Sequence, residues 1–245
     1  MPNRVAALYD IHGNLPALEA VLRDVRAAGV DHIVVGGDVL PGPMPRESLQ
    51  ALLDLDTPTS FIHGNGDREA IAPTGAVPEP YRESMRWNAA QLQPEDVARL
   101  AGWPSTLRLP VRGVGEVLFC HATPRNDVEI FTRATPEDRL LPIFGTLDVP
   151  LAVVGHTHMQ FDRTVGDVRV VNAGSVGMPF GEPGAYWLLL GPGVELRRTA
   201  YDLEQAARRI RATFYPNAEE FAATNVLQPP AEQQILGAFA HAELQ

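Results

Sequence analysis

Short runs of hydrophobic residues recur along the N-terminal part of the chain, and most of them are followed by glycine and polar residues. Uninterrupted apolar runs of this length are typical of buried strands. Between the first runs, apolar residues recur every three or four positions, which is the period of an amphipathic helix. This alternation predicts βαβ units with parallel strands and helices packed on the sheet. The expected strands are residues 5–9, 33–35, 60–62, 116–120 and 151–154, and the expected helices are residues 15–28, 45–53 and 136–144.

The chain changes character after residue 158, where short strand-like runs are joined by turn residues. We expect the apolar faces of two β groups to pack on each other with helices outside, which predicts an α/β fold with two layers of strands. The strands expected in this part are residues 160–165, 168–172, 186–190 and 195–199, and an amphipathic helix is expected over residues 202–213.

The chain of 245 residues is long enough for one domain with a well-buried core. Residues 73–110 have a helical, peripheral pattern that prolines interrupt, and two helical pieces flank Pro229 and Pro230 near the end. We therefore expect one domain over residues 1–245, with a core at residues 1–201 and a helical appendage at residues 202–245.

Composition narrows the classes of function. The formal net charge is −10, and non-specific nucleic-acid binding depends on a basic surface, so a nucleic-acid partner is not expected. All 20 basic residues are arginine, which excludes a lysine-dependent phosphate loop and Schiff-base chemistry. The single cysteine, Cys120, the absence of a signal-peptide pattern and the absence of a membrane-length apolar run predict a cytoplasmic protein without membrane contact.

The densest group of ligand-type residues is Gly155-His156-Thr157-His158, directly after the expected strand at residues 151–154. Side chains at i and i+2 at a strand end point the same way, so both imidazoles can reach one ion cluster. Gly155 is expected to permit a sharp backbone turn before the ligands. Similar residues follow the other strands, and functional groups collect where parallel strands end. The full set is Asp10, His12, Asp38, Asn65, His121, His156 and His158.

Carboxylate, amide and imidazole ligands together suit borderline divalent ions such as Mn²⁺, Fe²⁺, Co²⁺, Ni²⁺ or Zn²⁺. Seven ligands are too many for one tetrahedral ion and suit two ions that share a bridge. A carboxylate bridges well because it has two oxygens and a negative charge. Asp38, central in the order, is the expected bridge. Water held between two such ions loses a proton near neutral pH and becomes a nucleophile.

Five ordered blocks resemble those of the calcineurin-like metallophosphoesterases: Asp10-Ile11-His12, Gly37-Asp38, Gly64-Asn65, His121 and Gly155-His156-Thr157-His158. Residues 172–177 resemble a further block of the smaller prokaryotic phosphodiesterases, the YfcE-like branch. The resemblance implies a four-layer αββα sandwich with a dimetal site at its strand ends. It also implies that Asp10, His12, Asp38 and His158 hold the first ion, and that Asp38, Asn65, His121 and His156 hold the second.

The sequence departs from the family pattern at Gly66, where many members carry a histidine that assists the leaving group. The YfcE-like branch is similar in lacking that histidine. Because loss of a general acid typically costs ~10²–10⁴ in rate, we expect a narrower choice of substrates and retained activity. Asp67, the usual neighbour of the histidine, is then expected to pair with an arginine.

Further residues have two interpretations. Arg68 and Arg125 stand near ligand positions and, with Asn65, are candidates for holding the phosphate, although solvated surface arginines are common. His63 has either a structural or a catalytic role. Residues 172–177 form either a tight turn or a set of N–H groups that bind an anion.

These observations predict a cytoplasmic phosphohydrolase that depends on two divalent ions and acts on a small phosphoester. A phosphodiesterase in which a metal-bridging hydroxide attacks phosphorus in line is the first choice. A phosphomonoesterase or a dinucleoside polyphosphate hydrolase is the alternative among enzymes. A non-catalytic protein-interaction module of the same fold is the alternative of another class, and the presence of every ligand position counts against it.

Overall fold

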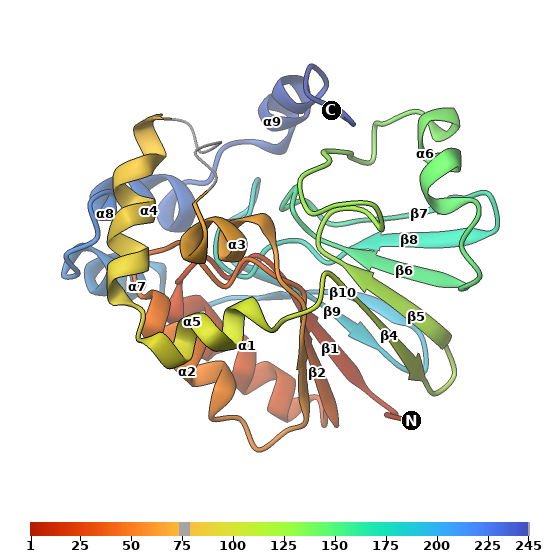
Figure 1. Cartoon of the computed structure of the whole chain (residues 1–245), viewed down its shortest axis with the longest axis horizontal. Coiled ribbons are helices and arrows are strands. Elements are labelled where there is room, and N and C mark those ends of the chain that lie inside the picture. Colours follow the sequence, from red (N-terminus) through yellow and green to blue (C-terminus); the bar gives the residue numbers. More distant parts are fainter. Residues whose placement is uncertain (74–78, 245) are drawn as a thin grey trace.

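Two five-stranded mixed sheets stack in the centre of the protein (Figure 1), whose computed structural model describes residues 1–73 and 79–244. In the first sheet β1, β2 and β3 are parallel, and α1 (Leu15–Ala27) and α2 (Pro45–Leu53) connect them. These are the βαβ units that the N-terminal pattern predicts. The strand order is β10-β9-β1-β2-β3, with β1 (Val5–Leu8), β2 (His32–Val35), β3 (Thr59–Phe61), β9 (Ala185–Leu190) and β10 (Val194–Thr199).

The second sheet has parallel strands in its centre and antiparallel strands at both edges. Its order is β4-β5-β6-β8-β7, with β4 (Thr106–Val111), β5 (Gly115–Cys120), β6 (Leu151–Val154), β7 (Phe161–Val165) and β8 (Val168–Asn172).

The prediction of a helical pattern up to residue 110 is wrong for β4. Leu107 and Leu109 pack into the core between the sheets, while the intervening Arg108 binds Glu116 and Asp148 outside. This period of two suits a strand paired along one side only, and Pro110 is tolerated because β4 is an edge strand. Pairing with β5 decides the conformation of this segment.

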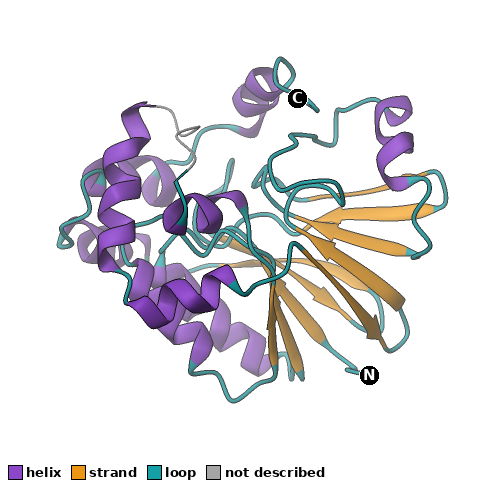
Figure 2. Ribbon diagram, in the orientation of Figure 1, coloured by secondary structure: helices purple, strands orange, loops and turns teal. Residues whose placement is uncertain are grey.

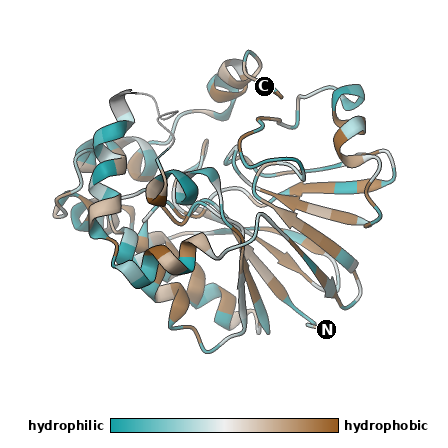
Figure 3. Ribbon diagram, viewed as in Figure 1, coloured by the Kyte–Doolittle hydropathy of each residue, from teal (hydrophilic) through white to brown (hydrophobic). Residues whose placement is uncertain are grey.

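Alternate residues along each strand face opposite layers. Tyr9 packs with Phe119 in the core between the sheets, whereas Leu8 faces the helices that cover the first sheet. Cys120 packs with Phe144 on the outer side of the second sheet. Figure 2 shows helices outside both sheets, and Figure 3 shows apolar residues concentrated along the strands. The four-layer αββα sandwich is confirmed.

The remaining helices are distributed around the two sheets (Figure 1), and the one at residues 137–144 packs through Phe144 on the outer face of the second sheet. The C-terminal helices pack through Ala207, Ile210 and Val226 against Met44. In the part of the chain that the structure describes, no helix is both long and apolar enough to cross a membrane. These helices are α3 (Asn65–Ile71), α4 (Glu79–Gln91), α5 (Pro94–Ala101), α6 (Glu137–Phe144), α7 (Leu203–Arg211), α8 (Ala218–Phe221), the π-helix η1 (Ala222–Leu227) and α9 (Glu232–Phe239).

Candidate metal centre

The predicted ligands stand on the loops that follow β1, β2, β5 and β6, and on the first residue of α3. Five of them have φ between 49° and 65°, in the left-handed region: Asp10, His12, Asp38, His156 and His158. This conformation costs a residue other than glycine roughly 1–2 kcal/mol. Such strain persists only where the surroundings fix it, and it collects at functional sites.

Backbone hydrogen bonds between the loops hold this strained conformation. The Asp10 N–H donates to the Gly37 carbonyl over 3.1 Å, and the His12 N–H donates to the Asp38 carbonyl over 3.0 Å. These bonds join the loop after β1 to the loop after β2. The loops after β5 and β6 are joined in the same way, because the Gly155 N–H donates to the His121 carbonyl over 2.8 Å.

The Asp10 carboxylate is buried and anchored at one oxygen only. Its Oδ2 accepts a hydrogen bond of 2.9 Å from the His156 N–H. Its Oδ1 has no hydrogen-bond partner and lies 3.2 Å from His158 Nε2 and 3.8 Å from His121 Nε2. A buried carboxylate oxygen without a donor is costly unless a cation neutralises it.

The Asp38 carboxylate repeats this arrangement. Its Oδ1 accepts a hydrogen bond of 2.7 Å from the Gly66 N–H. Its Oδ2 lies 3.7 Å from His12 Nε2 and 3.5 Å from His121 Nε2. Each of the two aspartates therefore turns one anchored oxygen away from the cluster and one oxygen into it.

Three histidines direct Nε2 into the cluster because Nδ1–H donates to a backbone carbonyl, which fixes the tautomer. His12 Nε2 and His158 Nε2 lie 3.3 Å apart. Two unprotonated imidazole nitrogens facing each other at this distance repel, and either a proton on one of them or a metal ion between them removes the repulsion. The Nδ1 donations are from His12 to Pro41 at 3.2 Å, from His121 to Gly36 at 2.9 Å and from His158 to Met178 at 2.8 Å.

His156 has the opposite orientation. Its Nε2–H donates to the Val128 carbonyl over 3.2 Å, so its Nδ1 carries the lone pair. One amide atom of Asn65 lies 3.0 Å from this Nδ1 and 3.2 Å from His121 Nε2. An NH₂ group at that place would donate to both rings, whereas a carbonyl oxygen there requires a cation. Asn65, His121 and His156 thus form a second convergent group of donors.

The donor set fits divalent ions. The ligand atoms of Asp10, His12 and His158 lie within 4.8 Å of one another, and so do those of Asp10, Asp38 and His121. Asp10 belongs to both groups, and Asp38 reaches His12 and His121 as well. Both aspartates are therefore placed where they can bridge, and the choice of Asp38 stays a prediction.

Opposite charges determine the proton affinities in the cluster. Burial disfavours charge on Asp38, but His121 and His12 outweigh it and hold the pKa of Asp38 below its usual value. Burial also disfavours charge on His121, but the carboxylates of Asp38 and Asp10 raise its pKa to about 10. Burial and the neighbouring His121 lower the pKa of His156 to about 4. A metal ion competes with protons for these nitrogens, because the same lone pairs bind both.

The structure places both candidate phosphate-binding arginines in ion pairs. Arg68 donates to both carboxylate oxygens of Asp127, over 2.9 and 3.0 Å, and lies 3.2 Å from Glu69. Arg125 pairs with Glu129. Arg68 lines the cavity that contains Asp38 and also a second, polar hollow, which Arg125 lines as well. Their binding of phosphate stays a prediction. His63 lies 3.6 Å from Asp127 in the same polar hollow.

The prediction that Asp67 pairs with an arginine is wrong. The side chain of Asp67 is 1% exposed and accepts three backbone hydrogen bonds. The donors are the N–H groups of Asp38 at 2.8 Å, Leu40 at 3.0 Å and Gly64 at 3.0 Å. Asp67 therefore joins the loop after β2 to the start of α3, and both segments carry predicted ligands.

Residues 172–177 form a turn that supports the neighbouring loops. The Asn172 side chain donates to the Gly155 carbonyl over 2.7 Å, and the Ser175 hydroxyl donates to the Asp10 carbonyl over 2.7 Å. The Gly177 N–H donates to the same Asp10 carbonyl over 3.0 Å. These contacts favour the turn interpretation over an anion site.

Neighbouring atoms lie so close to Gly155 and Gly66 that neither position has room for a Cβ. A Cβ at Gly155 would lie 2.4 Å from the Tyr9 ring and 2.6 Å from Asp10 Oδ2, and Gly155 has no positive φ. The expected sharp turn is therefore not the reason for this glycine. A Cβ at Gly66 would lie 2.3 Å from the Leu40 carbonyl oxygen. The family's histidine does not fit at Gly66 while the segment at Leu40 keeps this position.

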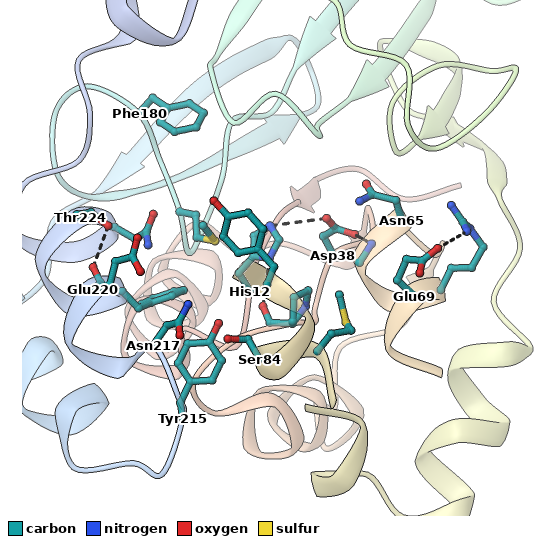
Figure 4. A pocket seen from close by; sticks show the side chains of 18 of the residues that line it. His12, Asp38, Asn65, Glu69, Ser84, Phe180, Tyr215, Asn217, Glu220 and Thr224 are labelled. Carbon is teal, nitrogen blue, oxygen red and sulfur yellow. Dashed lines mark hydrogen bonds and ion pairs between the residues drawn. The ribbon is translucent and has the colours of Figure 1, made fainter. Parts of the chain in front are cut away.

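The sequence did not predict the cavity of about 630 Å³ beside the cluster (Figure 4). His12, Asp38 and Asn65 lie along one side of it. Part of its lining comes from α4 and from the segment before and within η1, which include Tyr81 and Tyr215. The only sequence signal was the presence of aromatic residues in segments that otherwise look peripheral. The residues predicted as a C-terminal appendage thus contribute to the surroundings of the candidate site.

Comparison with known proteins gives a consistent picture. Residues 4–190 match the family model described as the calcineurin-like phosphoesterase superfamily domain. The chain is 27% identical over 234 residues to the uncharacterized protein MJ0912 of Methanocaldococcus jannaschii, which covers 84% of this chain and 91% of that protein.

Solved structures with the same fold include a metallophosphoesterase from Sphaerobacter thermophilus and the hypothetical protein PH1004 from Pyrococcus horikoshii OT3. The former has a TM-score of 0.73 and 26% identity, covering 92% of this chain and 100% of that one. The Pyrococcus protein has a TM-score of 0.77 and 22% identity, and the match covers 93% of this chain and 99% of that one. The E. coli phosphoesterase Yfce also matches, with a TM-score of 0.48 and 19% identity over 81% of this chain and 100% of that one.

Proposed function

The chain belongs to the calcineurin-like phosphoesterase superfamily, and we propose that it is a metal-dependent phosphodiesterase. The observation that carries the proposal is the unpartnered, buried Asp10 Oδ1, surrounded by imidazole nitrogens. Without a metal, the buried carboxylates are neutralised only by protons on neighbouring imidazoles such as His121, and these protons compete with metal ions for the same nitrogens. Two divalent ions would match its donors.

The resemblance to the family implies the roles of the residues. Asp10, His12, Asp38 and His158 would hold one ion, and Asp38, Asn65, His121 and His156 would hold the other. Divalent ions bound there would activate water and neutralise charge on the phosphate. The backbone carbonyls of Pro41, Gly36 and Met178 fix the three imidazoles in the orientation that binding requires. Asn65 would either donate its NH₂ to a phosphate oxygen or turn its carbonyl oxygen to an ion.

The charge of the cavity lining favours a diester over a monoester or a polyphosphate. Among the described residues that line it, Arg68 is the one cationic side chain apart from the His12 imidazole, and Asp127 and Glu69 already pair with it. Glu220 adds a further carboxylate to the lining. A phosphodiester carries one negative charge at neutral pH. The alternatives carry more, and apart from the two ions the described lining offers no unpaired cationic side chain for the additional charge.

The proposal is tested by measuring hydrolysis of a phosphodiester, a phosphomonoester and a dinucleoside polyphosphate. The protein is first treated with a chelator and then reconstituted with single metals. We expect diester hydrolysis to return with Mn²⁺, Fe²⁺, Co²⁺, Ni²⁺ or Zn²⁺, which accept nitrogen ligands, and to return least with Ca²⁺, which prefers oxygen.

Two outcomes would contradict the proposal. Full activity in excess chelator would exclude a metal requirement. A higher kcat/KM for the monoester or the polyphosphate than for the diester would transfer the assignment to that reaction.

Loss of all three activities in His158→Ala, but not in His32→Ala, would link the reaction to the cluster, since His32 bonds to Ser60 at the strand ends away from it.

A further inference from the structure

The cavity beside the cluster has two chemically distinct parts (Figure 4). One end contains Asp38 and Asn65 of the candidate metal centre. The other end is lined by Tyr215, Asn217 and Thr224 from the C-terminal helical region. A phosphate bound at the cluster therefore has one open space of about 630 Å³ beside it.

Aromatic and apolar side chains form much of this space. Phe180 stacks on the ring of His158, with centroids 5.6 Å apart and an interplanar angle of 21°. The ring of Phe239 in α9 packs edge-on against Phe180 from outside the cavity lining, with ring centroids 6.3 Å apart. Tyr81 lines the cavity from α4 and is 56% exposed. A flat ring would bury its apolar surface against these side chains.

The polar groups of the lining disfavour a negatively charged organic group in the cavity. Glu220 and Glu69 are acidic, and Glu69 pairs with Arg68. Asn217, Asn225 and Thr224 are neutral, and the Thr224 hydroxyl donates to the Glu220 carbonyl over 2.8 Å. Thr224 and Asn225 belong to the π-helix η1, where the Gln228 N–H donates to the Ala223 carbonyl over 2.9 Å. π-Helical turns are rare and are frequently found at functional sites.

We propose that this cavity binds one ester group of the substrate, and that this group is a flat aromatic ring system that is neutral or positively charged. The inference rests on the proposed function, because it takes the phosphorus to be held at the cluster. Burial of the ring against Tyr81 and Phe180 supplies affinity, and Glu220 disfavours an anionic ring. Long phosphate chains and carboxylated rings are therefore poor occupants.

The test measures binding, so that it does not depend on turnover. The probes are the phosphonate monomethyl esters of phenylphosphonic, methylphosphonic and 4-carboxyphenylphosphonic acid. Each carries one negative charge on the phosphonate, and they differ in the organic group on phosphorus. Dissociation constants are measured by NMR titration of the Zn²⁺-loaded protein. We expect the phenyl compound to bind ~10- to 100-fold more tightly than the methyl compound, from the buried area of one ring. The carboxyphenyl compound should bind several-fold more weakly than the phenyl compound.

Matched variants locate the effect. Tyr81→Ala should weaken binding of the phenyl compound, whereas Phe214→Ala should not, because Phe214 is 92% exposed and lies outside the lining. Glu220→Gln should improve binding of the carboxyphenyl compound. Glu219→Gln should not, because Glu219 pairs with Arg211 at the surface. All four positions are exposed, so the variants are expected to fold.

The outcomes separate this inference from the proposed function. Equal affinity for the phenyl and methyl compounds, or equal effects of the paired variants, would overturn the inference even if the enzyme hydrolyses diesters. A preference for the phenyl compound that Tyr81→Ala removes would support it even if no ester is hydrolysed, and in that case only the proposed reaction fails.

Discussion

The Asp67 carboxylate accepts a hydrogen bond of 2.8 Å from the backbone N–H of Asp38 and holds that predicted ligand in its left-handed conformation. The same oxygen accepts a hydrogen bond of 3.0 Å from the Gly64 N–H, at the start of the Asn65 segment. A side chain that makes no contact with an ion in this arrangement thus positions residues from both predicted ion sites. Outer residues that orient ligands typically affect metal affinity by ~10–100-fold.

We therefore predict that Asp67→Asn lowers metal affinity about tenfold or more, because one of its two side-chain atoms becomes a donor facing backbone N–H groups. Asp67→Ala should lower it further and also destabilise the fold, since each buried N–H without an acceptor costs about 1–3 kcal/mol. Metal titration and unfolding in chelator measure the two effects separately. The exposed Asp167→Asn is the control. Unchanged metal affinity in both Asp67 variants would mean that Asp67 only supports the fold.

Gly66 gives a second prediction. The Gly66→Ala side chain would meet the Leu40 carbonyl oxygen at 2.3 Å, so the neighbouring segment has to move. We expect a loss of about 1–3 kcal/mol in the free energy of unfolding. Metal affinity should also fall, because the Pro41 carbonyl orients His12.

Gly237→Ala is the matched control for Gly66→Ala, since no atom lies within 4 Å of a Cβ built at Gly237 in α9. The control should be neutral or stabilise the protein by about 0.5–1 kcal/mol, because alanine favours the helix. Gly66→His should be more disruptive than Gly66→Ala. A stable Gly66→His variant with enhanced activity would show that the family's histidine can be accommodated.

Because position 66 has no histidine, we predict that the rate of hydrolysis depends steeply on the pKa of the leaving group. Without a general acid at position 66, the departing oxygen must leave with most of its negative charge, so aryl phosphodiesters should react at least ~10² times faster than alkyl ones. A plot of log kcat/KM against leaving-group pKa for a series of aryl diesters measures this dependence. A shallow slope would mean that another residue donates the proton.

His63 predicts a pH effect on stability. The Asp127 carboxylate, 3.6 Å away, raises the pKa of His63, while His63 and Arg68 lower the pKa of Asp127 despite its partial burial. Because the folded pKa of His63 is raised, its stabilising effect is complete below the unfolded value of about 6.5 and is lost as pH rises through the folded value. Because the pKa of Asp127 is lowered, this carboxylate is charged in both the folded and the unfolded state above pH ~4, so its own contribution to stability does not change there.

His63→Gln should therefore lower the free energy of unfolding by about 0.5–1 kcal/mol near pH 5.5, with the difference disappearing at higher pH. Urea unfolding of both proteins at several pH values in chelator measures it. His32→Gln is the control, because its pKa is lowered by burial and its hydrogen-bond partner is Ser60. A difference that is the same at pH 5.5 and pH 9 would contradict a charge interaction.

The sequence predicted the two sheets, their flanking helices and the convergence of ligand-type residues, because each depends on local patterns. Buried strands are apolar over their whole length, and polar residues such as Asp10 and Asp38 must then follow where the strand leaves the core. The strand β4 was missed because its conformation is determined by pairing with β5, a partner that no local pattern reveals.

The cavity could not be predicted for a related reason. Its lining combines Tyr81 of α4 with Tyr215 and Thr224 near the C-terminus, and only the packing of distant segments brings them together. The role of Asp67 was also hidden, because its partners are backbone N–H groups rather than a side chain of opposite charge.

The number of metal ions bound per chain, measured by elemental analysis of the wild-type protein and of Asp38→Asn, is the most direct test of a dimetal phosphodiesterase. Asp38 Oδ2 lies between His12 and His121, which belong to the two predicted ion sites. We predict two ions per chain in the wild type and at most one in Asp38→Asn, with diester hydrolysis lost in parallel. His32→Ala should retain both ions. A wild-type protein that holds fewer than two ions when fully active, or an Asp38→Asn variant that keeps two ions and a near-normal rate, would contradict it.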